Sequence, residues 1–379
     1  MKNNTKIMPS TSSGTEIVTL GEVLEYEQPT KYLVKSENYN DKYDTPVLTA
    51  GQSFILGYTN EKEGIFEKFP VIIFDDFTTA TKFVDFPFKV KSSALKVLIP
   101  KLNLINIRYV FHLLQTIKID NERHKRYWIS QFSNIQIPLP PLPEQQRIAQ
   151  LLDTADLHRQ KTAQLLEQYN QLAQSLFLDM FGDPIANPKG WEVKELGEIC
   201  DFRTKGIAPE NFKKEYHYIG LEHIEKDTGK IIEKLNIEDI NLKSNKFWFD
   251  ENYILYGKLR PYLNKVANAD FEGVCSTDII PVKPIINKSV KEYILHFLKG
   301  KWFVDFADKN CSGANLPRIS PKKISNYKLI SPPIHLQNQF AKKIAQIEQQ
   351  KAILQQELQH AENLFGALLQ QSFSGKDTN

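Results

Sequence analysis

Cysteine is scarce in this 379-residue chain, which has only Cys200, Cys275 and Cys311. They are an odd number and widely spaced, so they form neither a disulfide framework nor a zinc-binding pattern. No run approaches the roughly 18 consecutive apolar residues of a membrane span. Residues 1–15 are polar, which predicts a disordered arm and not a signal peptide. We therefore expect a soluble multidomain protein of the reducing cytoplasm.

The chain also has almost no excess of one sign of charge, since its net charge is only +3. Residues 1–142 carry 17 Lys and Arg against 15 Asp and Glu, and residues 184–333 carry 24 against 20. The segment 143–183 between them carries 3 against 6. The positive excess thus lies in two separate regions, which is compatible with phosphate contact but does not by itself indicate nucleic acid.

Catalytic signatures are missing as well. The chain has no G-x-x-x-x-G-K-[ST] loop, no G-x-G-x-x-G and no Asn-Pro-Pro-aromatic tetrapeptide. The eight histidines are scattered, and His217 and His223 do not have the spacing of a helical metal site. Asp75 and Asp76 are adjacent at a strand end, so their side chains would point apart. The sequence predicts a non-catalytic chain with no metal and no cofactor of its own.

An internal repeat is the strongest positive signal. The segment 16–26 aligns with 192–202 at an offset of 176, and later matches such as Gln145 with Gln337 follow an offset of 192. The offset grows by 16 (192 − 176), so the second copy is longer by about that many residues. The repeat predicts two homologous domains, 16–142 and 184–333.

Each copy mixes short β-rich runs with helical patterns, which predicts an α+β fold whose strand order cannot be read. Strands are expected at 69–74, 82–86 and 95–99 in copy one and at 246–249, 253–256 and 278–282 in copy two. Helices are expected at 105–117 and 289–306.

A proline-rich hinge follows each domain and begins a long helix, predicted at 143–183 and 334–375 with Gly375 ending the second. Apolar residues recur in alternating steps of four and three, which favours a coiled coil between the two helices. Connectivity, together with a pseudo-two-fold relation between the copies, predicts that the helices are antiparallel and separate the two domains.

A second apolar stripe flanks the first on helix 143–183, at Leu151, Leu165 and Leu172. Two interpretations remain open. The stripe either packs within the chain or provides a docking face for a partner subunit.

These features together resemble the specificity subunit of type I restriction-modification systems over nearly the whole chain. The most specific parts are Pro138-Leu-Pro-Pro-Leu-Pro-Glu-Gln-Gln-Arg-Ile-Ala149, Ser175-Leu-Phe-Leu-Asp-Met-Phe-Gly-Asp-Pro184 and Tyr256-Gly-Lys-Leu-Arg-Pro-Tyr-Leu263. Copy two departs from the family pattern, because Pro332-Pro-Ile-His-Leu-Gln337 stands where a Pro-x-Glu-Gln sequence is usual. This difference could alter the second hinge or a subunit contact.

The resemblance implies two target-recognition domains that read the halves of an asymmetric, bipartite DNA target, with the helices as a ruler between them. It also implies two methyltransferase subunits, which bring S-adenosylmethionine and methylate adenine, and motor-nuclease subunits that use ATP and Mg²⁺. The expected partners are therefore double-stranded DNA and these subunits, in a phage-defence system.

Candidate DNA contacts are polar and basic residues in turns. For each of them the alternative is a solvated loop residue or a buried structural hydroxyl. Arg260 is the best single candidate. The full set is Thr78, Thr79, Thr81, Lys82, Lys89, Lys91, Ser92 and Ser93 in the first domain and Lys205, Lys258, Arg260, Tyr262, Ser276, Thr277, Asn315 and Arg318 in the second.

Two other functions compete with DNA recognition. One is a coiled-coil scaffold that joins two protein-binding domains, although a scaffold need not place basic turns at equivalent points of both domains. The other is a self-contained restriction enzyme, which would cleave DNA with Mg²⁺ and no partner.

Overall fold

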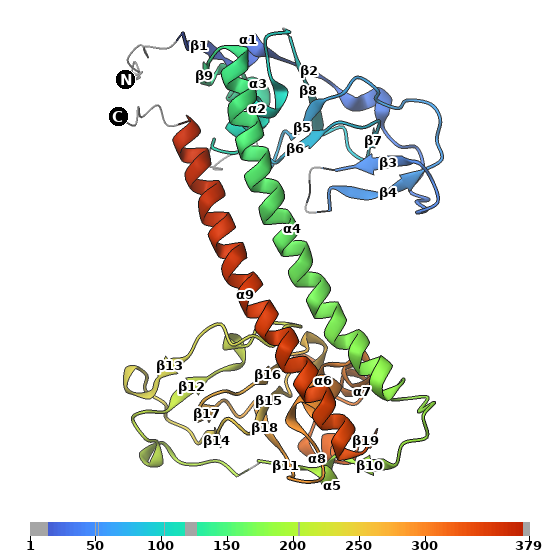
Figure 1. Ribbon diagram of the computed structural model, residues 1–379, viewed down its shortest axis with the longest axis vertical. Helices are drawn as coiled ribbons and strands as arrows, with labels where there is room; N and C mark the ends of the chain where they lie inside the picture. Colours follow the sequence, from blue (N-terminus) through green and yellow to red (C-terminus); the bar gives the residue numbers. More distant parts are fainter. Residues whose placement is uncertain are drawn as a thin grey trace. The chain divides into compact units, whose positions relative to one another are not determined.

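The computed structural model describes residues 14–49, 51, 53–101, 103–117, 127–203 and 205–373 (Figure 1). The predicted arm at 1–15 lies mostly outside the described residues, as does Gly375. The chain forms two compact units, unit 1 (residues 1–163 and 356–379) and unit 2 (residues 164–355). Two 40-residue helices, α4 (Leu142–Phe181) and α9 (Ile334–Phe373), contribute residues to both units.

Unit 1 contains two larger sheets and a strand pair. The four-stranded sheet has the order β2 (Leu24–Glu27), β8 (Leu95–Pro100), β5 (Val71–Asp75), β6 (Thr81–Val84), all antiparallel. The three-stranded sheet has the order β4 (Ile55–Thr59), β3 (Thr45–Leu48), β7 (Lys89–Val90). The pair is β1 (Glu16–Thr19) with β9 (Gln136–Leu139), and the short helices are α1 (Leu20–Val23), α2 (Ile107–Leu114) and α3 (Tyr127–Ser130).

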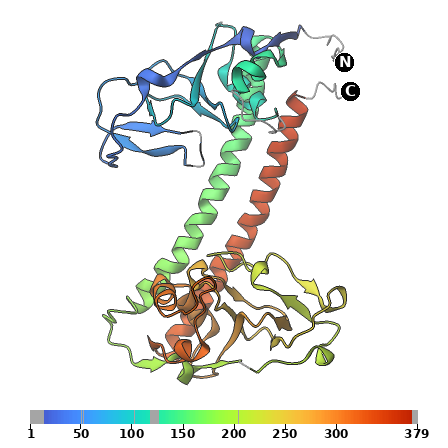
Figure 2. The same ribbon diagram turned by 180° about the vertical axis from the view of Figure 1, so that it is seen from behind.

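Unit 2 repeats this plan (Figure 2). Its first sheet has the order β11 (Cys200–Phe202), β18 (Ile279–Pro284), β15 (Ile254–Gly257), β16 (Val266–Asn268). Its second has the order β13 (Leu235–Asn236), β12 (His217–Ile219), β17 (Gly273–Cys275), β14 (Phe247–Phe249). The pair is β10 (Val193–Glu195) with β19 (Lys328–Ile330), and the helices are α5 (Leu196–Ile199), α6 (Lys291–Lys299), α7 (Lys301–Lys309) and α8 (Pro321–Ser325).

The two units share one strand topology, which confirms the repeat inferred from the sequence. The order β2-β8-β5-β6 corresponds to β11-β18-β15-β16, and the parallel pair β3 and β7 corresponds to β12 and β17. Matching backbone hydrogen bonds run from Leu20 N to Ile135 O and from Leu196 N to Tyr327 O. Strand β14 pairs antiparallel with β17, and at the equivalent place in unit 1 the structure has a single antiparallel bridge between Phe66 and Phe88, next to β7.

The strands expected from the sequence are confirmed, and the second expected helix is wrong in one respect. Helix 289–306 is interrupted, because α6 ends at Lys299 and α7 begins at Lys301. Gly300 lies between them with an extended backbone (φ −66°, ψ 143°), which no helical residue adopts.

Each unit buries its share of the long helices in its own core. In unit 1, Ile148, Ala149 and Leu152 of α4 pack in the same cluster as Phe365 of α9. In unit 2, the Phe177 ring of α4 lies 5.7 Å from the Phe340 ring of α9. Figure 2 shows these segments of α4 and α9 side by side. Among the described helices, none is both long and apolar enough to cross a membrane.

Candidate nucleic-acid interface

Three loops of unit 2 interlock and bring together most of the DNA-contacting residues that the sequence predicts in the second domain. The β15–β16 loop carries Lys258 and Arg260, the turn before β18 carries Ser276 and Thr277, and the segment 312–318 carries Asn315. Backbone hydrogen bonds join the loops: Lys258 N donates to Asp278 O (2.9 Å), Arg260 N to Pro317 O (2.7 Å) and Ile319 N to Lys258 O (3.1 Å). Residues up to 60 positions apart in sequence (318 − 258) thus form one surface, which we call the unit 2 loop cluster.

Arg260 occupies a left-handed backbone position (φ 50°) at the start of the turn Pro261–Leu263. Its side chain is exposed, and within the described part of the chain its guanidinium makes one long hydrogen bond, 3.5 Å to Asn315 O. Tyr262 lies in the same turn, and its aromatic side chain is 47% exposed. An exposed guanidinium and phenol on a constrained turn can meet a base edge or a phosphate.

Arg318 has a different position from the one expected of a free DNA contact. Its Nε and Nη2 donate to the two carboxylate oxygens of Asp278, at 2.8 and 3.0 Å. This hydrogen bond holds the pKa of the Asp278 carboxyl below its ordinary value. The pair joins segment 312–318 to the turn before β18, so Arg318 stabilises the loop cluster as well as bordering it.

The same serine turn precedes the equivalent strand in both units. In unit 1, Ser92 Oγ accepts a hydrogen bond from Ala94 N (3.1 Å). In unit 2, Ser276 Oγ accepts from Asp278 N (3.3 Å). The adjacent Ser93 and Thr277 are exposed in both cases. The sequence placed these residues in the candidate set, and the structure shows that they occupy equivalent positions.

The unit 1 counterpart of the β15–β16 loop is the tight β5–β6 turn. Asp75 Oδ1 accepts hydrogen bonds from Phe77 N (2.8 Å) and Thr78 N (3.0 Å), and Thr79 has a left-handed backbone (φ 60°). Thr78 is exposed, and Thr81 begins β6. The Lys82 ammonium lies 5.7 Å from the centre of the Phe54 ring, which precedes β4 in the neighbouring sheet.

A buried ion pair supports this turn and was not found from the sequence. Asp76 Oδ2 lies 3.2 Å from Lys96 Nζ, with side-chain exposures of 4% and 3%. Asp76 Oδ1 also accepts a hydrogen bond from Trp128 N (2.8 Å). The adjacent Asp75-Asp76 pair was a signal, but only the fold shows that Asp76 points into the core.

Three further lysines of the predicted set lie in different environments. Lys89 is 1% exposed, donates to Glu63 O (2.6 Å) and forms an ion pair with Glu61 (3.1 Å), so this side chain is not available to DNA. β7 directs it inward, which its sequence neighbours do not reveal. Lys91 pairs with Glu37, and Lys205 is exposed between β11 and the next turn.

The second apolar stripe is exposed on α4 in both units. Leu151 is 40% exposed in unit 1, and Leu165 and Leu172 are 41% and 48% exposed in unit 2. In unit 2, Leu172 borders a groove of about 340 Å³ that is also lined by Tyr169, Leu176, Lys343, Gln346, Ile347 and Gln350. Packing within the described parts of the chain therefore leaves these leucines largely uncovered.

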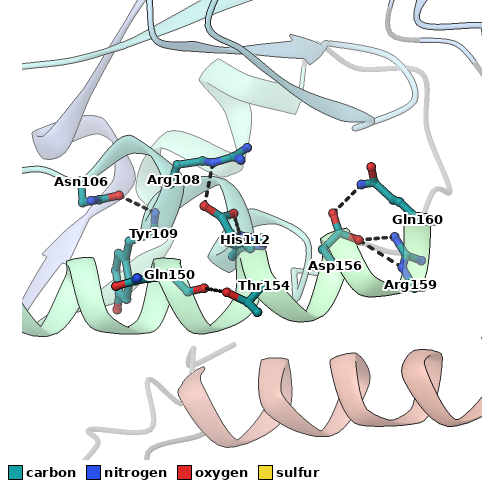
Figure 3. A network of polar contacts seen from close by, with 10 residues as sticks. Asn106, Arg108, Tyr109, His112, Gln150, Thr154, Asp156, Arg159 and Gln160 are labelled. Atoms are coloured by element: carbon teal, nitrogen blue, oxygen red, sulfur yellow. Dashed lines mark hydrogen bonds and ion pairs between the residues drawn. The ribbon is translucent and has the colours of Figure 1, made fainter. Parts of the chain in front are cut away.

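A polar network joins α2 to α4 within unit 1 (Figure 3). Asp153 of α4 accepts from Arg108 Nε (2.9 Å) and lies 2.7 Å from His112 Nε2. The two α2 side chains face α4 beside a groove of about 390 Å³. Among the described residues, no group of three or more His, Cys, Asp or Glu side chains could hold a metal ion.

The family model of the type I restriction modification DNA specificity domain matches the chain twice, over residues 12–168 and 188–363. The chain belongs to this family. The family is a DNA specificity domain, so the chain is a recognition subunit and not a catalytic one.

Characterised members of the family are similar to this chain in sequence. The type I restriction enzyme EcoR124I/EcoR124II specificity subunit of Escherichia coli is 36% identical over 356 residues, which cover 86% of this chain and 84% of that protein. The type I restriction enzyme EcoDI specificity subunit of Escherichia coli is 27% identical over 195 residues, or 50% of this chain and 43% of that protein.

Solved structures share the fold. A type I restriction-modification S subunit from M. genitalium has a TM-score of 0.62 at 16% identity, covering 99% of both chains. A chain from a study of complex assembly and conformational transition in the type I R-M system has a TM-score of 0.52 at 17% identity, covering 97% of this chain and 100% of that one.

Proposed function

We propose that this specificity subunit reads an asymmetric, bipartite DNA target, with one half-site bound by the loops of each unit. The observation that supports this most directly is the pair of loop clusters on one repeated framework. The β5–β6 turn with Ser92 and Ser93 is equivalent to the β15–β16 loop with Ser276 and Thr277, while the side chains on the two clusters differ. Equivalent frames with different side chains suit the reading of two different sequences.

The two long helices serve in this proposal as an antiparallel coiled coil that separates the recognition domains and relates them by a pseudo-two-fold axis. Within unit 1 the end of α9 packs on the start of α4, and within unit 2 the start of α9 packs on the end of α4. Both contacts are those expected of antiparallel helices. Inserting seven residues in each helix should lengthen the spacer between half-sites and leave the half-sites unchanged.

The partners proposed are two methyltransferase subunits and motor-nuclease subunits, which carry S-adenosylmethionine, ATP and Mg²⁺ and perform adenine methylation and restriction. The exposed Leu151, Leu165 and Leu172 are the proposed docking residues. Leu172→Glu should reduce co-purification of the methyltransferase subunit, whereas Gln171→Glu on the adjacent exposed position should not.

The decisive experiment measures DNA binding and methylation at moderate salt with the chain and its cognate methyltransferase subunit. Methylation mapping in a host that carries the system first identifies the target. We expect methylation at one split, non-palindromic sequence. Absence of sequence-dependent binding and methylation would refute the proposal and favour a scaffold, while Mg²⁺-dependent cleavage by the chain alone would indicate a self-contained nuclease.

A further inference from the structure

Two buried glutamines occupy equivalent places at the junction between each recognition domain and its long helix. Gln145 lies in the first turn of α4 and is 1% exposed, and Gln337 lies in the first turn of α9 and is 0% exposed. A fully buried amide is costly unless its donors and acceptors are paired. The pairing of these two amides therefore shows what they hold in place.

Gln145 connects three parts of unit 1. Its Oε1 accepts a hydrogen bond from Asn106 N (2.9 Å), the residue that caps the N-terminus of α2. Its Nε2 donates to Pro140 O of the hinge (2.8 Å) and to Leu104 O ahead of α2 (3.2 Å). One side chain thus ties the recognition domain, the proline hinge and the long helix together.

Gln337 makes two equivalent connections in unit 2. Its Oε1 accepts from Val290 N (3.0 Å), the residue before α6, and its Nε2 donates to Pro332 O of the second hinge (2.7 Å). The departure of Pro332-Pro-Ile-His-Leu-Gln337 from the usual family pattern therefore leaves this glutamine contact in place.

A tyrosine of each recognition domain also forms a hydrogen bond to the segment that leads into the hinge. Tyr109 Oη of α2 donates to Pro138 O (2.7 Å), and Tyr293 Oη of α6 donates to Ile330 O (2.6 Å). The same two clamps, glutamine and tyrosine, are thus built twice from different surrounding residues.

We propose that Gln145 and Gln337 are positioning residues that fix the angle between each recognition domain and its long helix, and thereby restrict the spacer length between the half-sites. The inference rests on the proposed function. A 40-residue helix is about 60 Å long, so a tilt of about 3° at one end displaces the other end by about 3 Å. This displacement is across the helix axis and is similar in size to the roughly 3.4 Å rise of one base pair, so a change in either hinge angle would move a recognition domain off its position on a duplex of native spacer length.

The test uses the complete chain in its assembly with the cognate methyltransferase subunits. Methylation rates are measured on three duplexes that share the mapped half-sites and differ only in a spacer of native length, one base pair shorter or one longer. We expect Gln145→Ala and Gln337→Ala to lower the ratio of native to altered-spacer rates at least about fivefold, since each removes a buried anchor of the hinge. The penalty for a substituted half-site base should stay unchanged.

Matched controls come from the next residue of each helix. Gln146 and Asn338 are exposed at positions equivalent to each other, so Gln146→Ala and Asn338→Ala should keep the wild-type ratio. A merely structural role would lower all three rates alike and leave the ratio unchanged, which would overturn the inference.

Two safeguards keep the outcomes separate. If an alanine variant does not assemble, Gln145→Met and Gln337→Met replace it, because methionine fills a similar volume and makes none of the amide hydrogen bonds. An unchanged ratio in these variants also overturns the inference. If the wild-type assembly methylates no split sequence, the proposed function itself fails.

Discussion

The two recognition units share a framework but stabilise their loops with different ion pairs. Unit 1 holds its β5–β6 turn with Asp76 and Lys96, which are both nearly inaccessible. Unit 2 has Lys258 and Ile280 at the equivalent strand positions, and it uses the partly exposed pair Asp278 and Arg318 instead. The framework is thus kept while the loop supports differ, as the proposed reading of two different half-sites requires.

The largest effect should come from breaking the buried pair. Asp76→Ala leaves the Lys96 ammonium buried without a counter-ion, and we expect a loss of about 3–5 kcal/mol in the free energy of unfolding of unit 1. Asp278→Ala should cost less, because the Arg318 guanidinium it frees can reach water. Urea denaturation of the full chain measures both.

The buried pair also has an internal control. Adding Lys96→Met to Asp76→Ala should restore part of the lost stability, because no buried charge then remains while Trp128 N still lacks its acceptor. An Asp278→Ala variant as unstable as Asp76→Ala would contradict the distinction between the two pairs.

The next effect concerns DNA affinity, where the two equivalent turns should differ. Arg260→Gly removes the guanidinium and tolerates the left-handed backbone, and we expect a loss of about 1–3 kcal/mol in binding free energy. Thr79→Gly, at the left-handed position of unit 1, should weaken binding less. The measurement is the affinity of each variant assembly for the mapped DNA target. Equal losses of affinity in Arg260→Gly and Thr79→Gly would show that Arg260 makes no special contact.

A pH effect on stability should arise at His296 of α6. Burial, together with Lys299 and Lys351, lowers the pKa of His296 below its ordinary value, and the facing ring is Phe340. Because the folded pKa lies below the unfolded one, the stabilising contribution is present above about pH 6.5 and is lost as pH falls toward the folded value.

The effect of His296 is measured as the change in the urea midpoint of unit 2 between about pH 7.5 and about pH 5. We expect His296→Leu to reduce the dependence, while His335→Leu, an exposed change at the start of α9, should not. In unit 1 the equivalent His112 faces Asp153 instead of lysines. An unaltered slope in His296→Leu would show that another group titrates.

The smallest effect tests the serine turns that the units share. Ser92→Ala and Ser276→Ala each remove one turn hydrogen bond, and we expect each to cost about 0.5–1.5 kcal/mol in unfolding free energy. Threonine at either position retains the hydroxyl and should be tolerated better. Clearly unequal losses would mean that the turns are equivalent in shape but not in energetic role.

Much of this architecture was accessible from the sequence because it depends on local pattern and on repetition. The offset of Gln145 to Gln337 indicated two domains, and short β-rich runs predicted strands that the structure contains. The apolar stripe expected on helix 143–183 ran through Ala173, Leu176 and Met180 and was incomplete, since Phe177 and Phe181 also lie in the core of unit 2. Their burial depends on Tyr293 and Phe340, which are distant in sequence.

The sequence by itself determined the repeat, the two long helices and the family resemblance, because periodicity and motif spacing lie within the chain. Only the tertiary structure decided which polar residues support the fold and which face solvent. Lys89 and Arg260 look alike as basic residues near turns, yet one is buried beside Glu61 and the other is exposed on a left-handed turn. The reason is physical: burial and pairing of a charge depend on residues that strand order brings together, and sequence neighbours do not specify them.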